Sequence, residues 1–423
     1  MKNHFSSIVT YILIILSGSA VVAQENQVSS LLSNIGLGVE FAEATVEEKG
    51  QGNLNVVGNN TEEVVSFANP ALLSDLQMTS FGITFQSLGA KTQSPDATVV
   101  NTASSIANLS IGLPLGLKGG FAAGLRINSA TGFEIDTEDT YNSGAGTVNH
   151  MYAGIGYRVF NGLSLGAQTN VYFGKSTKTQ VFRKTQQSTV LLDDYNVSGV
   201  ATKIGMQYQE LITRKLVARI GAYTVLEHSV TATGTNSFYE AVESSENTFT
   251  QRLNGAITTT DINGTQVNAT KSVFGLGVGE RNMWFAGLQY ETQGATSYTG
   301  SIYSNQVNST NLNIGLEDRS KINLGGYIIP KKYALKNYLN RVAYRAGFKY
   351  ETTGLLLNNN SVKNIGMTFG LGLPIGNKVS YANISVEIGR LGDFSKNNYQ
   401  EEYLNVGVNF TLSDKWFKKR VID

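Results

Sequence analysis

Hydrophobic and polar residues alternate with a period of two along most of the chain after residue 77. In residues 163–173 the leucines, Val171 and Phe173 occupy odd positions, while polar or small residues occupy even ones. Residues 363–373 and 402–412 repeat this alternation. Successive side chains of a strand point to opposite faces, so the pattern predicts strands with one apolar face. Strands of about ten residues with one such face are typical of barrels that cross a membrane.

Fourteen segments of this kind follow one another along the chain. They lie near residues 78–88, 104–115, 118–131, 147–160, 162–175, 195–210, 214–230, 271–280, 283–293, 319–329, 341–352, 363–373, 379–390 and 402–412. We therefore predict an all-β protein, an antiparallel transmembrane β-barrel of about 14 strands over residues 78–412. Low charge and abundant aromatic residues would also suit a soluble β-sandwich.

The connections between the segments alternate in length, which favours the barrel. Short turns are expected at 114–117, 161–162, 211–213, 280–282 and 374–377, and longer polar loops at 132–146, 176–194, 231–270 and 294–318. Outer-membrane barrels have short periplasmic turns and long external loops. With an even strand count, both termini are expected in the periplasm. The loop at 231–270 is compatible with hairpin extensions above the membrane or with a mobile segment.

The two ends of the chain carry their own signals. Lys2, an apolar run at 8–17 and small residues before Gln24 predict a secretory signal peptide over residues 1–23. A membrane anchor is the alternative, but the run is shorter than the roughly 18 residues a spanning helix needs. Residues 413–423 are expected to form a basic periplasmic tail, acting as an interfacial cap or a docking peptide.

Residues 24–77 show no alternation. They are rich in glycine, contain an acidic stretch at 40–48, and are too short to build a core of their own. We expect them to form an N-terminal periplasmic plug, or hatch, within the barrel, with a disordered tail as the alternative. Its apolar candidates for packing or ligand contact are Leu31, Leu32, Ile35, Leu37, Val39 and Phe41.

Charged residues also recur on the predicted inner face. An Arg or Lys on the lipid side of a barrel would cost ~2–4 kcal/mol at mid-membrane, so we place them in the lumen. A polar network is expected there from Arg126, Lys203, Arg219, Glu227, Glu291, Arg345, Lys349, Glu351 and Glu387. It could hold the plug to the wall, or provide a polar path or a carboxylate site. Arg345 and Lys349 lie roughly 13 Å apart along one strand, so they need a third cation to grip one carboxylate.

Composition narrows the chemistry further. The absence of cysteine excludes disulfides and thiolate metal sites, and a net charge of +1 gives no nucleic-acid signature. After the signal peptide, only His150 and His228 could serve a hydrolytic triad, and we read both as interfacial or rim residues. No phosphate loop or HExxH spacing occurs. We therefore predict neither an enzyme, a cofactor nor a metal site.

One motif resembles a known family. Asn69-Pro70-Ala71, just before the first predicted strand, is similar to the signature of the FadL/TodX (OmpP1) outer-membrane transporters. Residues 203–209 with 219–223 resemble the paired central strands of that family, and residues 340–351 resemble a late strand, followed by the strand that contains 370–372. The resemblance implies a kinked, plugged barrel that passes hydrophobic molecules. Related barrels also serve as accessory subunits of secretion translocons.

Two functions follow as hypotheses. The first is a Gram-negative outer-membrane protein for passive uptake of hydrophobic or amphipathic, fatty-acid-like molecules, with that molecule or a lipid as partner. The second is an accessory or scaffold barrel in a secretion or surface complex, whose partners are other outer-membrane proteins. The sequence leaves the ligand-binding residues and the identity of the ligand open.

Overall fold

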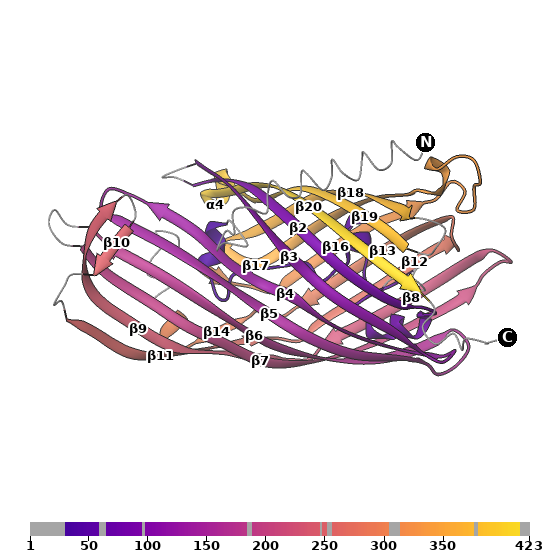
Figure 1. Ribbon diagram of the computed structural model, residues 1–423, viewed down its shortest axis with the longest axis horizontal. Helices are drawn as coiled ribbons and strands as arrows, with labels where there is room; N and C mark the ends of the chain where they lie inside the picture. Colours follow the sequence, from indigo (N-terminus) through magenta and orange to yellow (C-terminus); the bar gives the residue numbers. More distant parts are fainter. Residues whose placement is uncertain are drawn as a thin grey trace, which may run out of the picture.

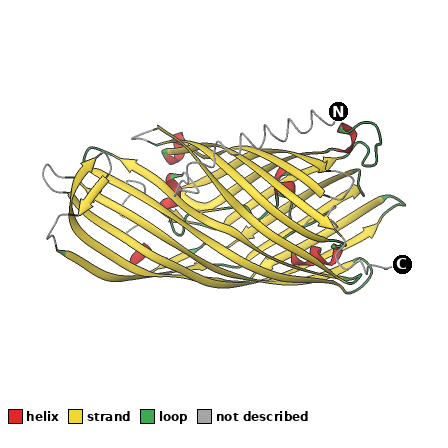
Figure 2. Cartoon of the chain, viewed as in Figure 1, coloured by secondary structure: helices red, strands yellow, loops and turns green. Residues whose placement is uncertain are grey.

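The computed structural model describes residues 30–58, 65–94, 98–183, 188–245, 248–251, 256–303, 314–375 and 380–414. These residues form an elongated, closed barrel of tilted antiparallel strands (Figures 1 and 2). The expected signal peptide at 1–23 and residues 415–423 of the expected basic tail lie outside the described residues.

Fourteen wall strands make up the barrel, which confirms the predicted fold and count. Ten of them are single strands: β2 (Thr79–Gln93), β3 (Thr98–Leu115), β4 (Gly119–Asp136), β5 (Thr140–Arg158), β6 (Leu163–Phe182), β7 (Ser188–Leu211), β17 (Ala343–Leu357), β18 (Asn360–Ile375), β19 (Ser380–Asp393) and β20 (Tyr399–Asp414). Four are interrupted: β8 (Leu216–Val225) with β9 (His228–Ser245), β12 (Lys271–Glu280) with β11 (Ile257–Asn268), β13 (Trp284–Gln293) with β14 (Ser297–Thr299), and β16 (Arg319–Ile328) with β15 (Ile314–Leu316). The first and last wall strands, β2 and β20, pair from Thr79↔Asp414 to Gln93↔Gln400 and close the barrel.

Most strands are longer than the sequence pattern predicts. β6 and β7 pair as far as Phe182↔Thr189, and β9 pairs with β11 as far as Tyr239↔Ile257. A further strand, β10 (Thr248–Gln251), folds back on β9 at the same end of the barrel (Figure 1). Of the two readings of 231–270, hairpin extension is therefore correct for its described part. Polar hairpins of this kind lack the apolar face that marks a spanning strand, which explains why they read as loops.

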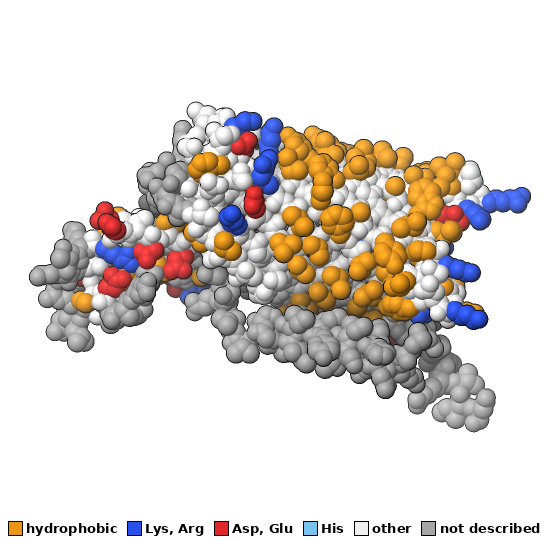
Figure 3. Space-filling model, turned by 90° about the horizontal axis from the view of Figure 1, so that it is seen from above, with side chains coloured by type: hydrophobic (Ala, Val, Ile, Leu, Met, Phe, Trp, Pro, Cys, Tyr) orange, Lys and Arg blue, Asp and Glu red, His pale blue; other side chains and the backbone are white. Residues whose placement is uncertain are grey.

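The outer wall is apolar. Its exposed side chains include Ile220, Leu276 and Phe369, each more than half exposed. Figure 3 shows exposed hydrophobic side chains as a broad band on one face, with basic and acidic side chains gathered at both of its ends. Within the described residues, no helix is long and apolar enough to cross a membrane. The band matches the lipid-facing belt of an outer-membrane barrel.

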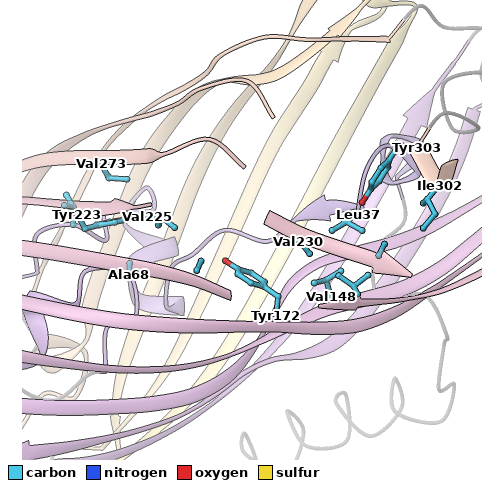
Figure 4. Packing of buried hydrophobic residues seen from close by; sticks show 14 of the residues in the cluster. Leu37, Ala68, Val148, Tyr172, Tyr223, Val225, Val230, Val273, Ile302 and Tyr303 are labelled. Carbon is cyan, nitrogen blue, oxygen red and sulfur yellow. The ribbon is translucent and has the colours of Figure 1, made fainter. Parts of the chain in front are cut away.

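The described parts of the N-terminal segment (residues 30–58 and 65–76) lie inside the wall (Figure 1, indigo). Its elements are η1 (Leu31–Asn34), β1 (Val39–Glu40), α2 (Val46–Gly50) and η2 (Pro70–Asp75). β1 pairs with Ser129 and Ala130 of β4. Figure 4 shows Leu37 and Ala68 of this segment near inward-facing wall residues such as Val148 and Tyr223. The two remaining elements, η3 (Leu339–Arg341) and α4 (Phe394–Asn397), lie in connections between wall strands.

Candidate functional site

The Asn69-Pro70-Ala71 motif begins η2, which lies against the inner wall. The side chain of Asn69 accepts a hydrogen bond from the backbone N–H of Ala71 at 3.1 Å and caps η2. Its Nδ2 donates to the backbone oxygens of Val56 at 2.8 Å and of Met206 at 3.2 Å. Asn69 thus ties two parts of the N-terminal segment to wall strand β7.

The motif packs against three aligned glycines of the wall. Gly156, Gly166 and Gly205 are register partners on β5, β6 and β7. A Cβ at Gly166 would lie 2.3 Å from the carbonyl carbon of Pro70, and one at Gly205 would lie 2.2 Å from Oδ1 of Asn69. No side chain fits in that space, so glycine is required for the close approach.

The glycine row continues around the barrel beneath residues 50–57. A Cβ at any of these wall positions would approach the backbone or side chains of that stretch to between 2.1 and 3.2 Å. The positions, on β8, β12, β13, β16, β17 and β18, are Gly221, Gly275, Gly287, Gly325, Gly347 and Gly370. We call the nine glycines of both sets the glycine belt. The belt explains part of the high glycine content of the chain, because wall residues that contact the N-terminal segment have no room for a side chain.

Glu43 of the N-terminal segment is the centre of one ion-pair network. Its carboxylate contacts the ammonium of Lys203 on β7, lies 3.2 Å from that of Lys271 on β12, and lies 3.7 Å from the guanidinium of Arg126 on β4. Arg126 also donates to the backbone oxygen of Phe41 at 3.1 Å. Three wall cations therefore converge on one segment carboxylate, and burial from water strengthens that attraction.

Wall strands β16, β17 and β19 carry a second network. Arg319 of β16 bridges Glu40 of the N-terminal segment and Glu351 of β17, at 2.7 Å each. Beside it, Lys349 of β17 pairs with Glu387 of β19. The segment is thus held by charges on several wall strands.

Helix α2 supplies further contacts. Glu47 accepts a hydrogen bond from Asn383 at 2.5 Å, and Asn383 in turn accepts one from Arg345 at 3.1 Å. Glu48 forms a capping box with Thr45 and accepts the Ser66 hydroxyl at 2.9 Å, while burial raises the pKa of Glu48 to about 8. Lys49 donates to Gln86 of β2 at 2.6 Å, and burial lowers its pKa to about 8.

A cavity of about 340 Å³ remains between the N-terminal segment and the wall. Carboxylates and cations of both networks line it, together with amides such as Asn170 and Asn268. His150 and His228 also face it, and Tyr172 stacks on His228 with ring centroids 5.4 Å apart. Both ring nitrogens of His150 are buried without a hydrogen-bond partner among the described residues. Apolar side chains such as Leu37, Val148 and Val225 share the lining, so the open part of the lumen is amphipathic.

The predicted polar residues mostly face this lumen. Buried on the inner face are Arg126, Lys203, Arg219, Glu291, Lys349, Glu351 and Glu387, and Arg345 points inward towards Gly50. Arg219 donates to Gln209 at 3.2 Å, near the turn end of the barrel. Lys203 and Arg219 do not join Arg345 and Lys349 around one position: Lys203 pairs with Glu43, while Lys349 pairs with Glu387.

Two expectations need correction. Glu227 is exposed, because it lies in the two-residue break between β8 and β9, where the inward–outward alternation stops. His150 and His228, expected at the rim or interface, line the lumen cavity. His150 is on the inner face because it is the register partner of Arg126, whose side chain points to Glu43.

Several charged residues in the lumen were not predicted from the sequence. Glu40 and Glu43 belong to a stretch without alternation, so no pattern indicated their direction. Lys271 and Arg319 stand at the very start of their strands, at positions in phase with the inward Val273 and Lys321. Both residues lie within the predicted segments 271–280 and 319–329, so applying the alternation to the first residue of each segment would have found both cations.

One stretch of the wall is not paired. β3 and β4 pair only over residues 108–115 and 119–126, whereas residues 98–106 of β3 pair with β2 alone and Ala107 lies at a register shift. The other half of β4 pairs with β5, and two of its residues pair with β1 on its free side. The register of β4 against β5 shifts between Ile127 and Ser129, where this separation begins. We call the separation between 98–107 and 127–136 the side gap.

In the described part of the chain, no group of three or more His, Asp or Glu side chains is placed to hold a metal ion. The buried charges instead pair with one another or with amides. The arrangement can hold a segment in place and bind small polar or amphipathic molecules in the remaining cavity.

Comparison with solved structures shows the fold. The toluene transporter TodX of Pseudomonas putida is 15% identical, with 88% of this chain and 98% of that chain covered and a TM-score of 0.60. The toluene transporter TbuX of Ralstonia pickettii is 12% identical, with 88% and 99% covered and a TM-score of 0.60. A FadL homologue of Pseudomonas aeruginosa is 9% identical, with 88% and 98% covered and a TM-score of 0.58. The predicted resemblance to the FadL/TodX barrels is confirmed at the level of fold.

Sequence comparison adds a family. No curated protein matches the chain. A family model described as BamG, however, matches residues 5–423, nearly the whole sequence. This chain belongs to the BamG family.

Proposed function

We propose that this protein is an accessory barrel of the barrel-assembly (Bam) complex in the outer membrane, to which the description of its family points. The observation that carries the proposal is the seating of the N-terminal segment. Its backbone lies on the glycine belt, and its carboxylates pair with cations on the wall strands β4, β7, β12 and β16. A lumen filled in this way fits a rigid scaffold that contacts its partner proteins through its outer surface.

The charged groups that line the lumen support the same proposal. The cavity left by the N-terminal segment is lined by both ion-pair networks. An apolar solute entering it would displace water from charged groups without replacing their hydrogen bonds, which is unfavourable. Transport along the barrel axis would also require the N-terminal segment to move away from the glycine belt. We propose neither a catalytic role nor a cofactor.

Affinity purification in mild detergent tests the scaffold role. The tagged protein is expected to carry other Bam subunits with it, and its depletion is expected to slow the assembly of other outer-membrane barrels. Recovery of a lone barrel, together with normal assembly after depletion, would contradict the proposal. An unrelated tagged outer-membrane barrel serves as the control for carry-over.

A channel for hydrophobic molecules is the second candidate, and the side gap favours it. A solute leaving sideways into the membrane would avoid most of the charged lumen. TodX, TbuX and the hydrocarbon channel CymD share the fold and are named for such transport. Cells lacking the protein should then take up a labelled fatty acid or toluene more slowly. Unchanged uptake of both probes would exclude this candidate and leave the scaffold role intact.

We further propose an orientation and a division of the chain. Thr79 at the start of β2 pairs with Asp414 at the end of β20, so the barrel begins and ends at one rim. The long hairpins project from the opposite rim, which supports a periplasmic position for both termini. The proposed units are a signal peptide (1–23), a plug (24–77), the barrel (78–412) and a basic tail (413–423). Labelling of single cysteines in whole cells tests the orientation. Position 138, in the hairpin between β4 and β5, is compared with position 215, in the turn between β7 and β8 at the other rim.

A further inference from the structure

Two cross-strand rows of residues face outward over the closing seam of the barrel. Thr102, Gly89, Leu404, Ile388 and Met367 form one row across β3, β2, β20, β19 and β18. The adjacent row, two residues nearer the hairpin end, is Val100, Lys91, Glu402, Arg390 and Ile365. Since alternate residues share a face, both rows lie on the lipid side of the wall.

A groove of about 650 Å³ lies across these ten residues. Its flanks are Val100 of β3 and Met367 of β18, which are 69% and 58% exposed. Gly89 forms part of its floor, because a Cβ there would meet nothing nearer than Thr102 Oγ1 at 3.7 Å. Leu404 and Ile388 complete an apolar floor, so the groove offers contact for a hydrocarbon chain in place of bulk lipid.

The upper row adds charge at one end of the apolar surface. Lys91, Glu402 and Arg390 are exposed and stand on three adjacent strands, in the order positive, negative, positive. Strands are spaced by about 4.8 Å, so the two cations are roughly 10 Å apart with the carboxylate between them. Neither cation forms a salt bridge with another described residue. Figure 3 shows basic and acidic side chains where the hydrophobic band ends.

We propose that this groove is a binding site for one membrane lipid with a zwitterionic, amine-bearing headgroup. The acyl chain lies over Gly89 and Leu404. Lys91 and Arg390 pair with the phosphate, and Glu402 accepts hydrogen bonds from the primary ammonium. An anionic headgroup without an amine would leave Glu402 facing negative charge, and a quaternary amine has no N–H to donate.

Lipid titration of the whole purified protein, followed by native mass spectrometry, tests the site. Phosphatidylethanolamine is expected to bind about five- to tenfold more tightly than phosphatidylcholine or phosphatidylglycerol with the same acyl chains, the order that one charge-assisted hydrogen bond provides. Glu402→Gln should abolish the preference for phosphatidylethanolamine over phosphatidylcholine. The Lys91→Gln/Arg390→Gln variant should weaken the binding of both.

Two further variants separate the groove from general surface effects. Gly89→Leu fills the floor and should lower phosphatidylethanolamine binding with all three charges intact. Arg214→Gln/Lys215→Gln removes two exposed cations at the opposite end of the barrel and should leave binding unchanged. Equal binding of the three lipids, unchanged binding in Gly89→Leu, or an equal loss in the distant variant would each overturn the proposal. None of these outcomes depends on whether the protein joins the Bam complex.

Discussion

The carboxylate of Glu43 contacts the ammonium of Lys203 inside the barrel, across 160 residues of sequence. Lys203 is fully buried on β7, and its ammonium also donates to the backbone oxygen of Phe67 at 3.1 Å. Both of these contacts are to the N-terminal segment. The wall cation and the segment therefore depend on each other: without Glu43, Lys203 would keep a buried charge with one neutral acceptor.

Replacing Glu43 should destabilise the barrel strongly. Glu43→Gln leaves Lys203, Lys271 and Arg126 around one uncharged amide, and an uncompensated buried charge typically costs about 3–5 kcal/mol. Urea unfolding in lipid vesicles, followed by tryptophan fluorescence, should show this loss in the free energy of unfolding. The matched control is Glu138→Gln, which neutralises an exposed carboxylate in a loop and should change little. The double variant Glu43→Gln/Lys203→Met should lose less than the two single losses combined, and simple additivity would contradict the coupling.

Filling the glycine belt should expel the N-terminal segment. Gly166→Val places methyl groups where the backbone of Pro70 and Ala71 now lies, and overpacking of this kind costs about 1–3 kcal/mol. Limited proteolysis is expected to cut within residues 24–77 of the variant under conditions that leave the parent intact. Gly89→Ala is the control, because its added methyl has free space on the outer wall. Equal resistance of all three proteins would show that the segment is not held by this contact.

Hydrogen exchange should reveal the side gap. Amides of β3 over residues 98–106 have a paired neighbour only on the β2 side, whereas residues 108–112 are paired on both sides. About half of the amides in the first stretch should therefore exchange quickly in nanodiscs, and few in the second. Uniform protection along β3 would mean that the gap closes in a lipid bilayer.

The stability of the protein should depend on pH through Glu48. Burial raises its pKa from 4.5 to about 8, so the folded state binds the proton more tightly than the unfolded chain. Its contribution is then fully present below pH 4.5 and is lost as the pH rises towards 8. Lys49 acts outside this window, since its lowered pKa of about 8 makes stability rise with pH only above that value. Unfolding measured from pH 5 to 8 should show a weaker decline in Glu48→Gln than in the parent, and parallel curves would exclude this role.

The architecture of the wall was predictable from residue order. Alternation gives the facing of each side chain without any knowledge of neighbours, which is why Arg126, Lys203 and Glu387 were placed correctly on the inner face. It failed at Glu227, where the strand breaks, and it was not applied to Lys271 and Arg319, the first residues of two predicted strands. The polar hairpin of β9 and β11 extends beyond the membrane. Its strands therefore lack the alternating apolar face by which spanning strands are recognised.

By itself, the sequence determined the barrel, its fourteen wall strands and which face of each strand points into the lumen. These features follow from the alternation of polar and apolar residues that a barrel strand needs in a membrane. Only the tertiary structure decided that Glu43 meets Lys203, that nine glycines form one belt, and that β3 parts from β4. Those features depend on strand register and on the path of a segment without periodicity. Residues far apart in the sequence fix both, through contacts that no local pattern encodes.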